Sequence, residues 1–305
     1  MNNGKRLLVY LANGVQGGAV ARQAANRGYT VRALVRDTRK SDSLKALGTE
    51  IAPGDLQDAA SLNEAHRDVD YVVMQMPIGA PPQIASLTDN AICAMRLCGI
   101  QGVIVKMASA QPTIRTEVAS FVANQIVEDK MRASGIAFSI VRPTIYLDNF
   151  LKPDTREGIS RRGIIVYPVP ADQRIAWTSA DDAARAALSL LENNCFGNDR
   201  LISGTDPVDG GSLALAFSEA LQRDVKFQSL SLDDLEREVD MVMGAGVGKR
   251  VSAKFRFLEQ HPDQAERMLS LPFNPSPALR GFLPTPIRNW VAERRSMFIS
   301  PGSAE

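Results

Sequence analysis

A glycine-rich turn carries the clearest chemical signal in this sequence. Residues 12–18 read ANGVQGG, so Gly14 and Gly17 stand three apart and Gly18 follows directly. A turn of this kind between a strand and a helix lets the backbone approach a diphosphate, whose charge then lies on the free amides of the helix. The context fits, because the apolar run RLLVYLA (6–12) precedes the turn and a helical pattern follows it. We therefore expect a dinucleotide to be held by Asn13, Gly14, Val15, Gln16 and Gly17.

The turn departs from its usual pattern at one position. Leu11 stands where a first glycine normally eases the exit from the strand. Asn13, two residues later, belongs to the residue types that best tolerate unusual backbone angles, and we expect it to absorb the bend. The alternative is a sheet turn that has kept its glycines without binding a cofactor.

The residues after the second apolar run bear on the choice of cofactor. Arg36 lies 22 residues after Gly14, and Lys40 follows one helical turn later. A guanidinium and an ammonium suit the 2′-phosphate of NADP(H), whereas an acidic residue in this place holds the two ribose hydroxyls of NAD. We favour NADP(H). In the rival interpretation Asp37 is the ribose ligand and Arg36 is a surface charge.

The proton-transfer pair of ordinary short-chain dehydrogenases, Tyr-x-x-x-Lys, is absent. None of the five tyrosines has a lysine four residues later; they are Tyr10, Tyr29, Tyr71, Tyr146 and Tyr167. Any proton donor must therefore be another group.

Composition and charge exclude several other classes. A net charge of +1 argues against a nucleic-acid platform, and no apolar run approaches the roughly 20 residues that span a bilayer. Cys93, Cys98 and Cys195 lack CxxC spacing, which predicts reduced thiols in a cytoplasmic protein. His66 and His261 are too few and too far apart for a metal site, and His66 is expected to be solvated at a polar helix end.

The elements that must position these residues alternate between short apolar strands and helices over residues 1–150. This alternation predicts a doubly wound parallel α/β sheet, to which residues 175–204 return. Residues 151–174 and 205–305 are expected to form a smaller, mainly helical cap or substrate domain. Met241, Met243, Phe255 and Phe257 either line an apolar pocket in this cap or simply pack within it.

At this point the sequence resembles a known family. The stretches ANGVQGGAV (12–20), GYTVRALVRDTRK (28–40), VKMAS (105–109) and VEDKMRASGIAFSIVRPTIYLDNF (127–150) are similar to those of NmrA-like proteins, a branch of the atypical short-chain dehydrogenases/reductases. Gln16 within the turn is the most specific residue. The turn and the Arg-x-x-x-Lys spacing most resemble the NADP(H)-sensing, HSCARG-like members. The resemblance covers the first two thirds of the chain well and the last third loosely.

The resemblance implies further cofactor contacts, all at the carboxyl ends of strands. Asp55 and Leu56 flank the adenine, and Gln75, Met76 and Pro77 border the nicotinamide ribose. A third segment, with Pro143, Thr144 and Tyr146, meets the nicotinamide. The family register places Ser120 and Asn124 where the missing dyad would stand.

Two functions remain open from the sequence. In the first, the protein is an NADPH-dependent reductase of a small conjugated or aromatic molecule, with candidate polar groups Lys106, Ser109, Tyr146 and Asn149. Lys106 and Tyr146 also have ordinary structural interpretations, as a strand-edge lysine reaching solvent and as an aromatic at the rim of the core. In the second, the protein binds NADP(H) without turnover and signals redox state to a protein partner. We expect a small-molecule substrate, no direct contact with nucleic acid or membrane, and a homodimer.

Overall fold

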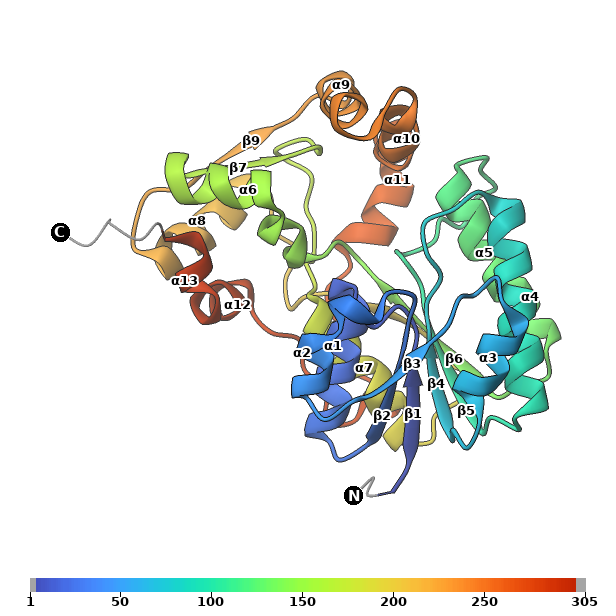
Figure 1. Ribbon diagram of the computed structural model, residues 1–305. Coiled ribbons are helices and arrows are strands. Elements are labelled where there is room, and N and C mark those ends of the chain that lie inside the picture. Colours follow the sequence, from blue (N-terminus) through green and yellow to red (C-terminus); the bar gives the residue numbers. More distant parts are fainter. Residues whose placement is uncertain (1–3, 300–305) are drawn as a thin grey trace.

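A parallel sheet forms the N-terminal part of the protein in a computed structural model that describes residues 4–299 (Figure 1). The described residues give a sheet of seven strands in the order β3-β2-β1-β4-β5-β6-β8, and every neighbouring pair is parallel. The strands are Arg6–Val9 (β1), Thr30–Val35 (β2), Glu50–Pro53 (β3), Tyr71–Met74 (β4), Gly102–Lys106 (β5), Phe138–Pro143 (β6) and Asp199–Ile202 (β8). The predicted doubly wound α/β sheet is confirmed.

Helices cover both faces of this sheet. Val15–Asn26 (α1) and Ala180–Glu192 (α7) pack on one face, with the short helix Asp42–Ala46 (α2) beside α1. Ala59–His66 (α3), Pro81–Leu97 (α4) and Ala119–Ala133 (α5) cover the other. Strand β1 serves both layers, because Leu7 lies in the first apolar cluster and Leu8 in the second. Apolar residues therefore follow one another along the strand without a polar alternation.

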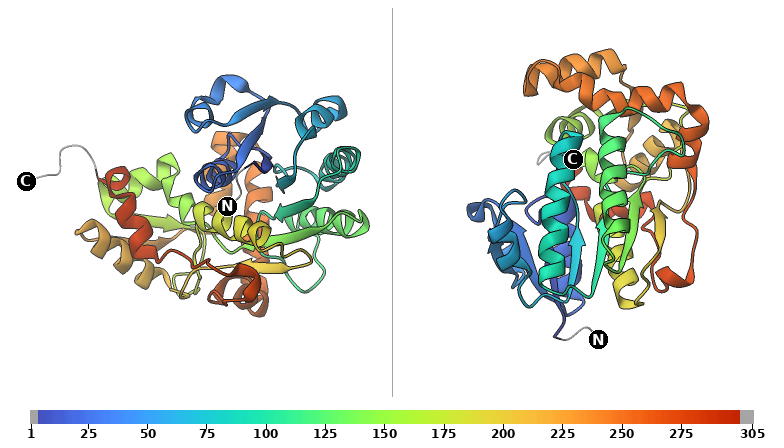
Figure 2. Two further views of the ribbon diagram at one scale, coloured as in Figure 1. Left: turned by 90° about the horizontal axis from the view of Figure 1, so that it is seen from below. Right: turned by 90° about the vertical axis from the view of Figure 1, so that its right-hand side faces the viewer.

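The second part of the molecule lies over the carboxyl ends of the strands (Figure 2). It contains the parallel strand pair Ile164–Tyr167 (β7) and Lys226–Ser229 (β9). Its helices are Pro153–Glu157 (α6), Gly210–Leu221 (α8), Leu232–Met243 (α9), Val247–Gln260 (α10), Pro262–Ala265 (α11), Ile287–Glu293 (α12) and Arg295–Phe298 (α13). We call this part the cap. The sequence did not predict β9, because KFQS is short and mostly exposed.

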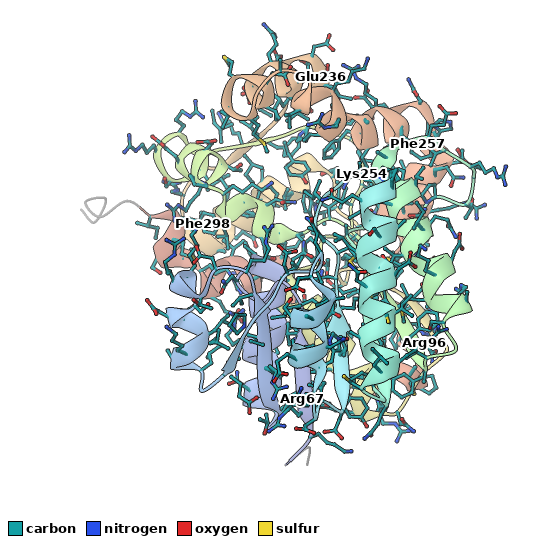
Figure 3. All side chains as sticks on the ribbon, turned by 45° about the vertical axis from the view of Figure 1, so that its right-hand side comes forward. Arg67, Arg96, Glu236, Lys254, Phe257 and Phe298 are labelled. Atoms are coloured by element: carbon teal, nitrogen blue, oxygen red, sulfur yellow. The ribbon has the colours of Figure 1, made fainter. Side chains whose placement is uncertain are left out.

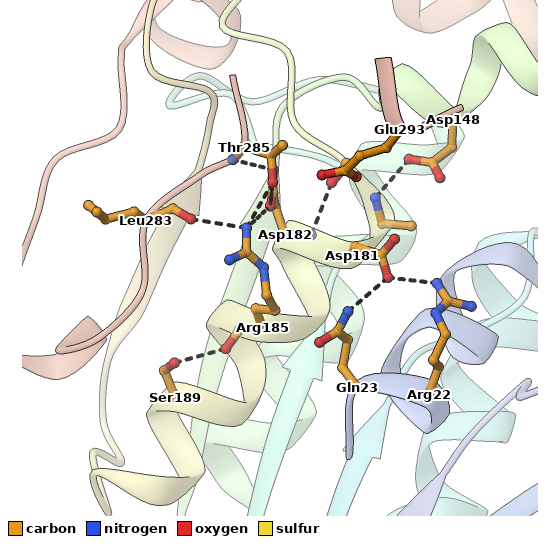
Figure 4. A network of polar contacts seen from close by, with 12 residues as sticks. Arg22, Gln23, Asp148, Asp181, Asp182, Arg185, Ser189, Leu283, Thr285 and Glu293 are labelled. Carbon is orange, nitrogen blue, oxygen red and sulfur yellow. Dashed lines mark hydrogen bonds and ion pairs between the residues drawn. The ribbon is translucent and has the colours of Figure 1, made fainter. Parts of the chain in front are cut away.

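Polar contacts at the start of α7 join the two parts. The carboxylate of Asp181 accepts hydrogen bonds from Arg22 at 2.6 Å and Gln23 at 3.2 Å, both on α1 (Figure 4). Its second oxygen accepts from Arg294, which follows α12, at 2.9 Å. One carboxylate therefore fastens the cap's last helices to the sheet layer. The division into two domains with the boundaries given above stays a prediction.

His66 corrects a prediction. It was expected to be solvated, but it is fully buried, and its ring nitrogens lie 2.9 Å from the Tyr10 hydroxyl and 2.7 Å from the Leu62 carbonyl oxygen. Burial lowers the pKa of His66 to about 4, so the ring is neutral at physiological pH. His66 is a structural residue between β1 and α3.

No helix among residues 4–299 is long and apolar enough to cross a membrane.

Candidate functional site

The turn predicted to bind the dinucleotide bends tightly after β1, and Leu11 itself makes the bend. Leu11 has φ +51°, in the left-handed region, and its carbonyl oxygen accepts a hydrogen bond from the Gly14 amide at 2.9 Å. This conformation costs an ordinary L-residue roughly 1 kcal/mol. The Leu11 side chain packs against the apolar cluster on the α3–α4 face of the sheet. The prediction that Asn13 absorbs the bend is therefore wrong.

Asn13 has a different part in the turn. Its side-chain amide donates to the Asp37 carbonyl oxygen at 3.0 Å, and its amide oxygen accepts from the Ser41 hydroxyl at 3.3 Å. These bonds tie the turn to the segment after β2, where the cofactor-selecting residues were predicted. The two halves of the predicted cofactor site are thus held against each other.

Gly17 is required by close backbone approach. A Cβ at this position would lie 2.4 Å from the Leu11 carbonyl oxygen and 2.8 Å from Nε2 of Gln75. The first of these is backbone and cannot swing away. Gln75 is also fixed, because it is buried and donates to the Tyr10 carbonyl oxygen at 3.0 Å. Any side chain at Gly17 would therefore displace α1 from the sheet.

The start of α1 has donors without acceptors. The first amide bonded within the helix is that of Gly18, which donates to Gly14 at 2.7 Å, and no side chain caps the helix. The amides of Val15, Gln16 and Gly17 consequently have no acceptor among residues 4–299. The first turn carries no acidic residue. This donor set fits a diphosphate, whose charge the helix dipole would also favour.

At the end of β2, two exposed cationic side chains lie beside a carboxylate that is already paired. The side chains of Arg36 and Lys40 are exposed and form no hydrogen bond or ion pair within the described part of the chain. Asp37, in contrast, is held by Arg39, whose Nε lies 2.9 Å from one carboxylate oxygen, and it caps the 3₁₀ turn Thr38–Lys40 (η1). The Arg39 guanidinium lowers the pKa of the Asp37 carboxyl. The arrangement favours a phosphate ligand over a ribose ligand at this position.

The residues expected to border adenine and ribose lie at the next two strand ends. Asp55 and Leu56 follow β3; the Asp55 carboxylate accepts from the Gln57 amide at 2.9 Å, and Leu56 is buried. Gln75, Met76 and Pro77 follow β4. Both segments lie at the same edge of the sheet as the turn, because all these strands are parallel.

Lys106 lies at the centre of the other end of the site. It is the last residue of β5, only 3 % exposed, and its Nζ donates to Oε1 of Gln16 and to the Tyr146 hydroxyl, the latter at 3.1 Å. The alternative of a lysine reaching solvent is therefore wrong. Three segments far apart in sequence meet here: the β1–α1 turn, the end of β5 and the segment after β6.

Burial sets the proton affinities of this group. It lowers the pKa of Lys106 to about 7, despite an opposing contribution from Asp148, and raises the pKa of Tyr146 well above its ordinary range. Burial also raises the pKa of Asp148, whose carboxylate accepts from the Ala180 amide at 2.7 Å at the start of α7 (Figure 4). Lys106 is consequently a group that can gain or lose a proton near neutral pH.

The other predicted polar groups have their own partners. Asn149 lies on the 3₁₀ segment Leu147–Leu151 (η2) and donates to the Tyr167 hydroxyl at 3.1 Å. The Ser109 and Thr144 hydroxyls donate to the carbonyl oxygens of Ala110 and Ala176. Pro143 ends β6. Of the four catalytic candidates, only Lys106 and Tyr146 contact each other.

Sequence reasoning missed two neighbours of the site and one contact of a residue that it had predicted. Gln16 was expected to serve the cofactor turn, yet it is also the partner of Lys106; Asp148 and Tyr167 were not singled out as neighbours of the site. Asp148 and Tyr167 act through contacts across the fold, with Ala180 and Asn149, so no local pattern could have revealed them.

The dyad positions lie on α5. Asn124, at the place of the dyad's lysine, is buried, and its Nδ2 has no hydrogen-bond partner among the described residues. A buried amide donor without an acceptor is unfavourable unless a ligand completes it.

The apolar residues predicted for the cap divide into two pairs. Phe257 is buried and Phe255 is partly buried, with ring contacts to Phe121 at 5.3 Å and Tyr167 at 6.2 Å respectively. Met241 and Met243, in contrast, are 79 % and 64 % exposed at the end of α9. These two methionines therefore fit neither prediction: they do not line a pocket, and they do not pack within the cap.

Comparisons with known proteins agree with this fold. An NAD(P)H azoreductase of Xenophilus azovorans is 25 % identical over 233 residues, which are 76 % of this chain and 79 % of the relative. The Citrobacter sp. triphenylmethane reductase complexed with NADP(H) superposes with a TM-score of 0.73 at 18 % identity, covering 95 % of this chain and 99 % of the other. NmrA, a negative transcriptional regulator in complex with NADP, superposes with a TM-score of 0.71 at 16 % identity, covering 99 % and 98 %. At these identities the two structures establish the fold.

The family follows from the sequence profile. The profile of the NmrA-like family matches residues 3–272, which include the turn, the end of β2 and the Lys106 group. The chain belongs to the NmrA-like family.

Proposed function

We propose that this protein is an NADPH-dependent reductase of a small conjugated or aromatic molecule. The observation that carries the proposal is the buried meeting of Lys106, Gln16 and Tyr146 beside the dinucleotide turn. A protonatable group with a pKa near 7 lies where the strand ends converge on the expected nicotinamide.

In this proposal NADP(H) lies along the carboxyl edge of the sheet. The free amides of Val15, Gln16 and Gly17 hold the diphosphate, and Arg36 with Lys40 holds the 2′-phosphate. The Asp55–Leu56 and Gln75–Pro77 segments line the adenine and ribose. The unpaired amide of Asn124 is suited to a ribose hydroxyl, and Pro143, Thr144 and Tyr146 border the nicotinamide.

The bound NADPH supplies a hydride, and Lys106 supplies the proton. For a quinone, one hydride and one proton give the hydroquinone, with NADP⁺ as the other product. The Lys106 ammonium protonates the oxygen that gains negative charge and is then reprotonated from solvent. Tyr146 keeps its own proton, because burial raises its pKa, and orients the ammonium through their hydrogen bond.

The relatives support the substrate class. The azoreductase and the triphenylmethane reductase are named for reactions on extended aromatic molecules. Phe150, Tyr167 and Trp177 form a contiguous set of buried rings with centroids 5.0 to 5.7 Å apart, and Asn149 joins this set to the segment that carries Tyr146.

Oxidation of NADPH tests the proposal. Purified protein is mixed with NADPH and a panel of quinones, enones, imines and azo compounds, and the absorbance of NADPH at 340 nm is followed. We expect turnover with at least one aromatic acceptor. Tight NADPH binding without oxidation across the panel would contradict the proposal.

A second function, a redox sensor that binds NADP(H) without turnover, rests on the missing dyad. Ser120 and Asn124 replace its tyrosine and lysine, and a regulator shares the fold. In that case NADPH and NADP⁺ would differ in how strongly they protect the cap from proteolysis, and a protein partner would bind only one of the two complexes.

Other aspects of the function remain proposals. The three cysteines are unpaired within the described chain, which suits the reducing cytoplasm. A homodimer and the lack of contact with nucleic acid stay predictions.

A further inference from the structure

Gln16 belongs to two parts of the proposed site at once. Its backbone amide is one of three at the start of α1 that have no acceptor among residues 4–299. Its side-chain oxygen Oε1 accepts a hydrogen bond from Nζ of Lys106, a residue 90 positions further along the chain. The backbone of Gln16 is therefore free for the expected diphosphate, while its side chain contacts the expected proton donor.

The backbone at Gln16 is held in place on both sides. The Gly18 amide donates to the Gly14 carbonyl oxygen at 2.7 Å, which closes the first turn of α1 around Gln16. Gly17 is buried, and a Cβ on it would lie 2.4 Å from the Leu11 carbonyl oxygen. The side chain of Gln16 thus starts from a fixed point, and its reach is set by the fold of the turn.

The cap covers the end of the sheet at which Lys106 lies. Figure 3 shows Glu236 and Lys254 of the cap beyond one end of the strands and Arg67, which precedes β4, at the other end. Lys106 is the last residue of β5 and is buried. Protein groups must therefore replace most of the water that would surround its charge.

The Lys106 ammonium has two neutral acceptors and no ion pair in the described part of the chain. Its Nζ donates to Oε1 of Gln16 and to the Tyr146 hydroxyl, the latter at 3.1 Å. Asp148 favours the charged form, but its carboxylate accepts from the Ala180 amide at 2.7 Å instead. Burial lowers the pKa of Lys106 to about 7 against this influence. The charged form therefore depends on its hydrogen bonds to two neutral oxygens.

Gln16 is the stronger of the two acceptors. An amide carbonyl oxygen carries more negative charge than a phenol oxygen, and Tyr146 keeps its own proton because burial raises its pKa. A hydrogen bond accepted from the charged form favours that form and fixes the direction of the ammonium. Without Gln16, Lys106 would lose proton affinity and would be free to rotate about its side-chain bonds.

We propose that Gln16 is the positioning residue of the proton donor: its carboxamide oxygen fixes the Lys106 ammonium in place and favours its charged form. This inference rests on the proposed function for the role of Lys106, and it assigns control of that role to a residue of the cofactor turn. Cofactor binding and proton transfer then share one residue, through its backbone amide and its side chain respectively.

Two substitutions change the acceptor in opposite directions, and NMR follows the result without turnover. Gln16→Glu keeps the shape and adds a carboxylate beside the ammonium, whereas Gln16→Met keeps the length and removes the acceptor. The pH titration of Lys106 is recorded on the cofactor-free full chain with isotopically labelled lysine, and Lys106→Met identifies its signal. We expect the midpoint to rise by about one pH unit or more in Gln16→Glu and to fall by about half a unit in Gln16→Met.

The pH profile of the reaction should follow the same order. Because the ammonium is the active form, kcat/KM on an active quinone should begin to fall at a higher pH in Gln16→Glu than in the wild type, and at a lower pH in Gln16→Met. NADPH affinity should stay within about threefold in Gln16→Met, which keeps the backbone amide. Gln125→Met, which removes an exposed glutamine bonded to Asp129 at 2.8 Å, is the matched control and should move neither the titration nor the profile.

Titration midpoints that moved in the same direction in both variants, or in neither, would overturn the proposal, since a loss of packing alone would not depend on the sign of the charge. So would a loss of NADPH affinity of about tenfold in Gln16→Met, which would assign the side chain to the cofactor. If the midpoints move as expected and no acceptor is reduced, the proposed reaction is wrong and Gln16 still controls Lys106. If a quinone is reduced and the midpoints stay in place, the positioning is wrong and the reductase stands.

Discussion

The two ends of the proposed cofactor site differ in the state of their polar groups. At the phosphate end, the amides of Val15, Gln16 and Gly17 and the side chains of Arg36 and Lys40 have no protein partner in the described chain. At the nicotinamide end, Lys106 donates hydrogen bonds to both Gln16 and Tyr146. The phosphate end can therefore bind a ligand without breaking hydrogen bonds, whereas a ligand at the nicotinamide end must compete with the hydrogen bonds of Lys106. Affinity for the cofactor should therefore depend on the phosphate end, and turnover on the nicotinamide end.

Gly17→Ala should have the largest effect, and on binding. The added Cβ would lie 2.4 Å from the Leu11 carbonyl oxygen, so the turn must open. The amides of Val15, Gln16 and Gly17 would then no longer point together at the diphosphate. We expect NADPH affinity to fall roughly 100-fold, measured by calorimetry. Gly211→Ala on α8, whose Cβ would meet nothing closer than 3.6 Å, is the control. Equal affinities in the two variants would show that the turn does not hold the cofactor.

Lys106→Met should affect turnover instead. Removing the proton donor should lower kcat about 100-fold on an active quinone and leave NADPH affinity within about threefold. Lys130→Met, which removes a surface lysine paired with Asp89, serves as the control. If the loss fell on NADPH binding and kcat were kept, the two ends of the site would not divide binding from chemistry as described.

The pH dependence of kcat/KM tests whether Lys106 is the proton donor. Because burial lowers the pKa of Lys106 to about 7, the ammonium needed as proton donor is present below this pH and lost above it. We expect kcat/KM to be level below pH 6 and to fall about tenfold per pH unit above pH 8. The profile of Lys106→Met should be level over the same range. A wild-type rate that rises through pH 7 would assign Lys106 the opposite role, that of a base.

Leu11 should give the smallest effect, and a diagnostic one. Leu11→Ala loses apolar packing and keeps the left-handed strain, whereas Leu11→Gly loses the same packing and relieves the strain. The glycine variant should therefore be the more stable of the two by about 1 kcal/mol in urea unfolding, although glycine is the less stable residue at most positions. An alanine variant as stable as the glycine variant would show that the turn stores no strain.

The sequence predicts the parts of this molecule that depend on local pattern. The parallel sheet followed from unbroken apolar runs such as LLVYL and YVVM, and the turn from its glycines between a strand and a helix. The cations after β2 could be located because their place is fixed by distance along the chain from Gly14.

Other features depend on contacts between distant segments. Lys106 looked like a strand-edge residue, and only its contacts with Gln16 on α1 and Tyr146 after β6 show that it is enclosed. His66 looked solvated, and its partner Tyr10 lies 56 residues away. The positive φ of Leu11 could not be predicted, because asparagine adopts unusual backbone angles more readily than leucine and the sequence therefore favoured Asn13. The tertiary structure overrides this preference.

The central claim, that this protein binds NADP(H) through a 2′-phosphate site at the end of β2, is tested most directly by calorimetric titration of the wild type and Arg36→Ala with NADPH and NADH. The account predicts that Arg36→Ala weakens NADPH binding roughly tenfold or more and leaves NADH binding unchanged, because only the phosphate loses a partner. Equal losses for the two coenzymes, or no binding of either by the wild type, would contradict it.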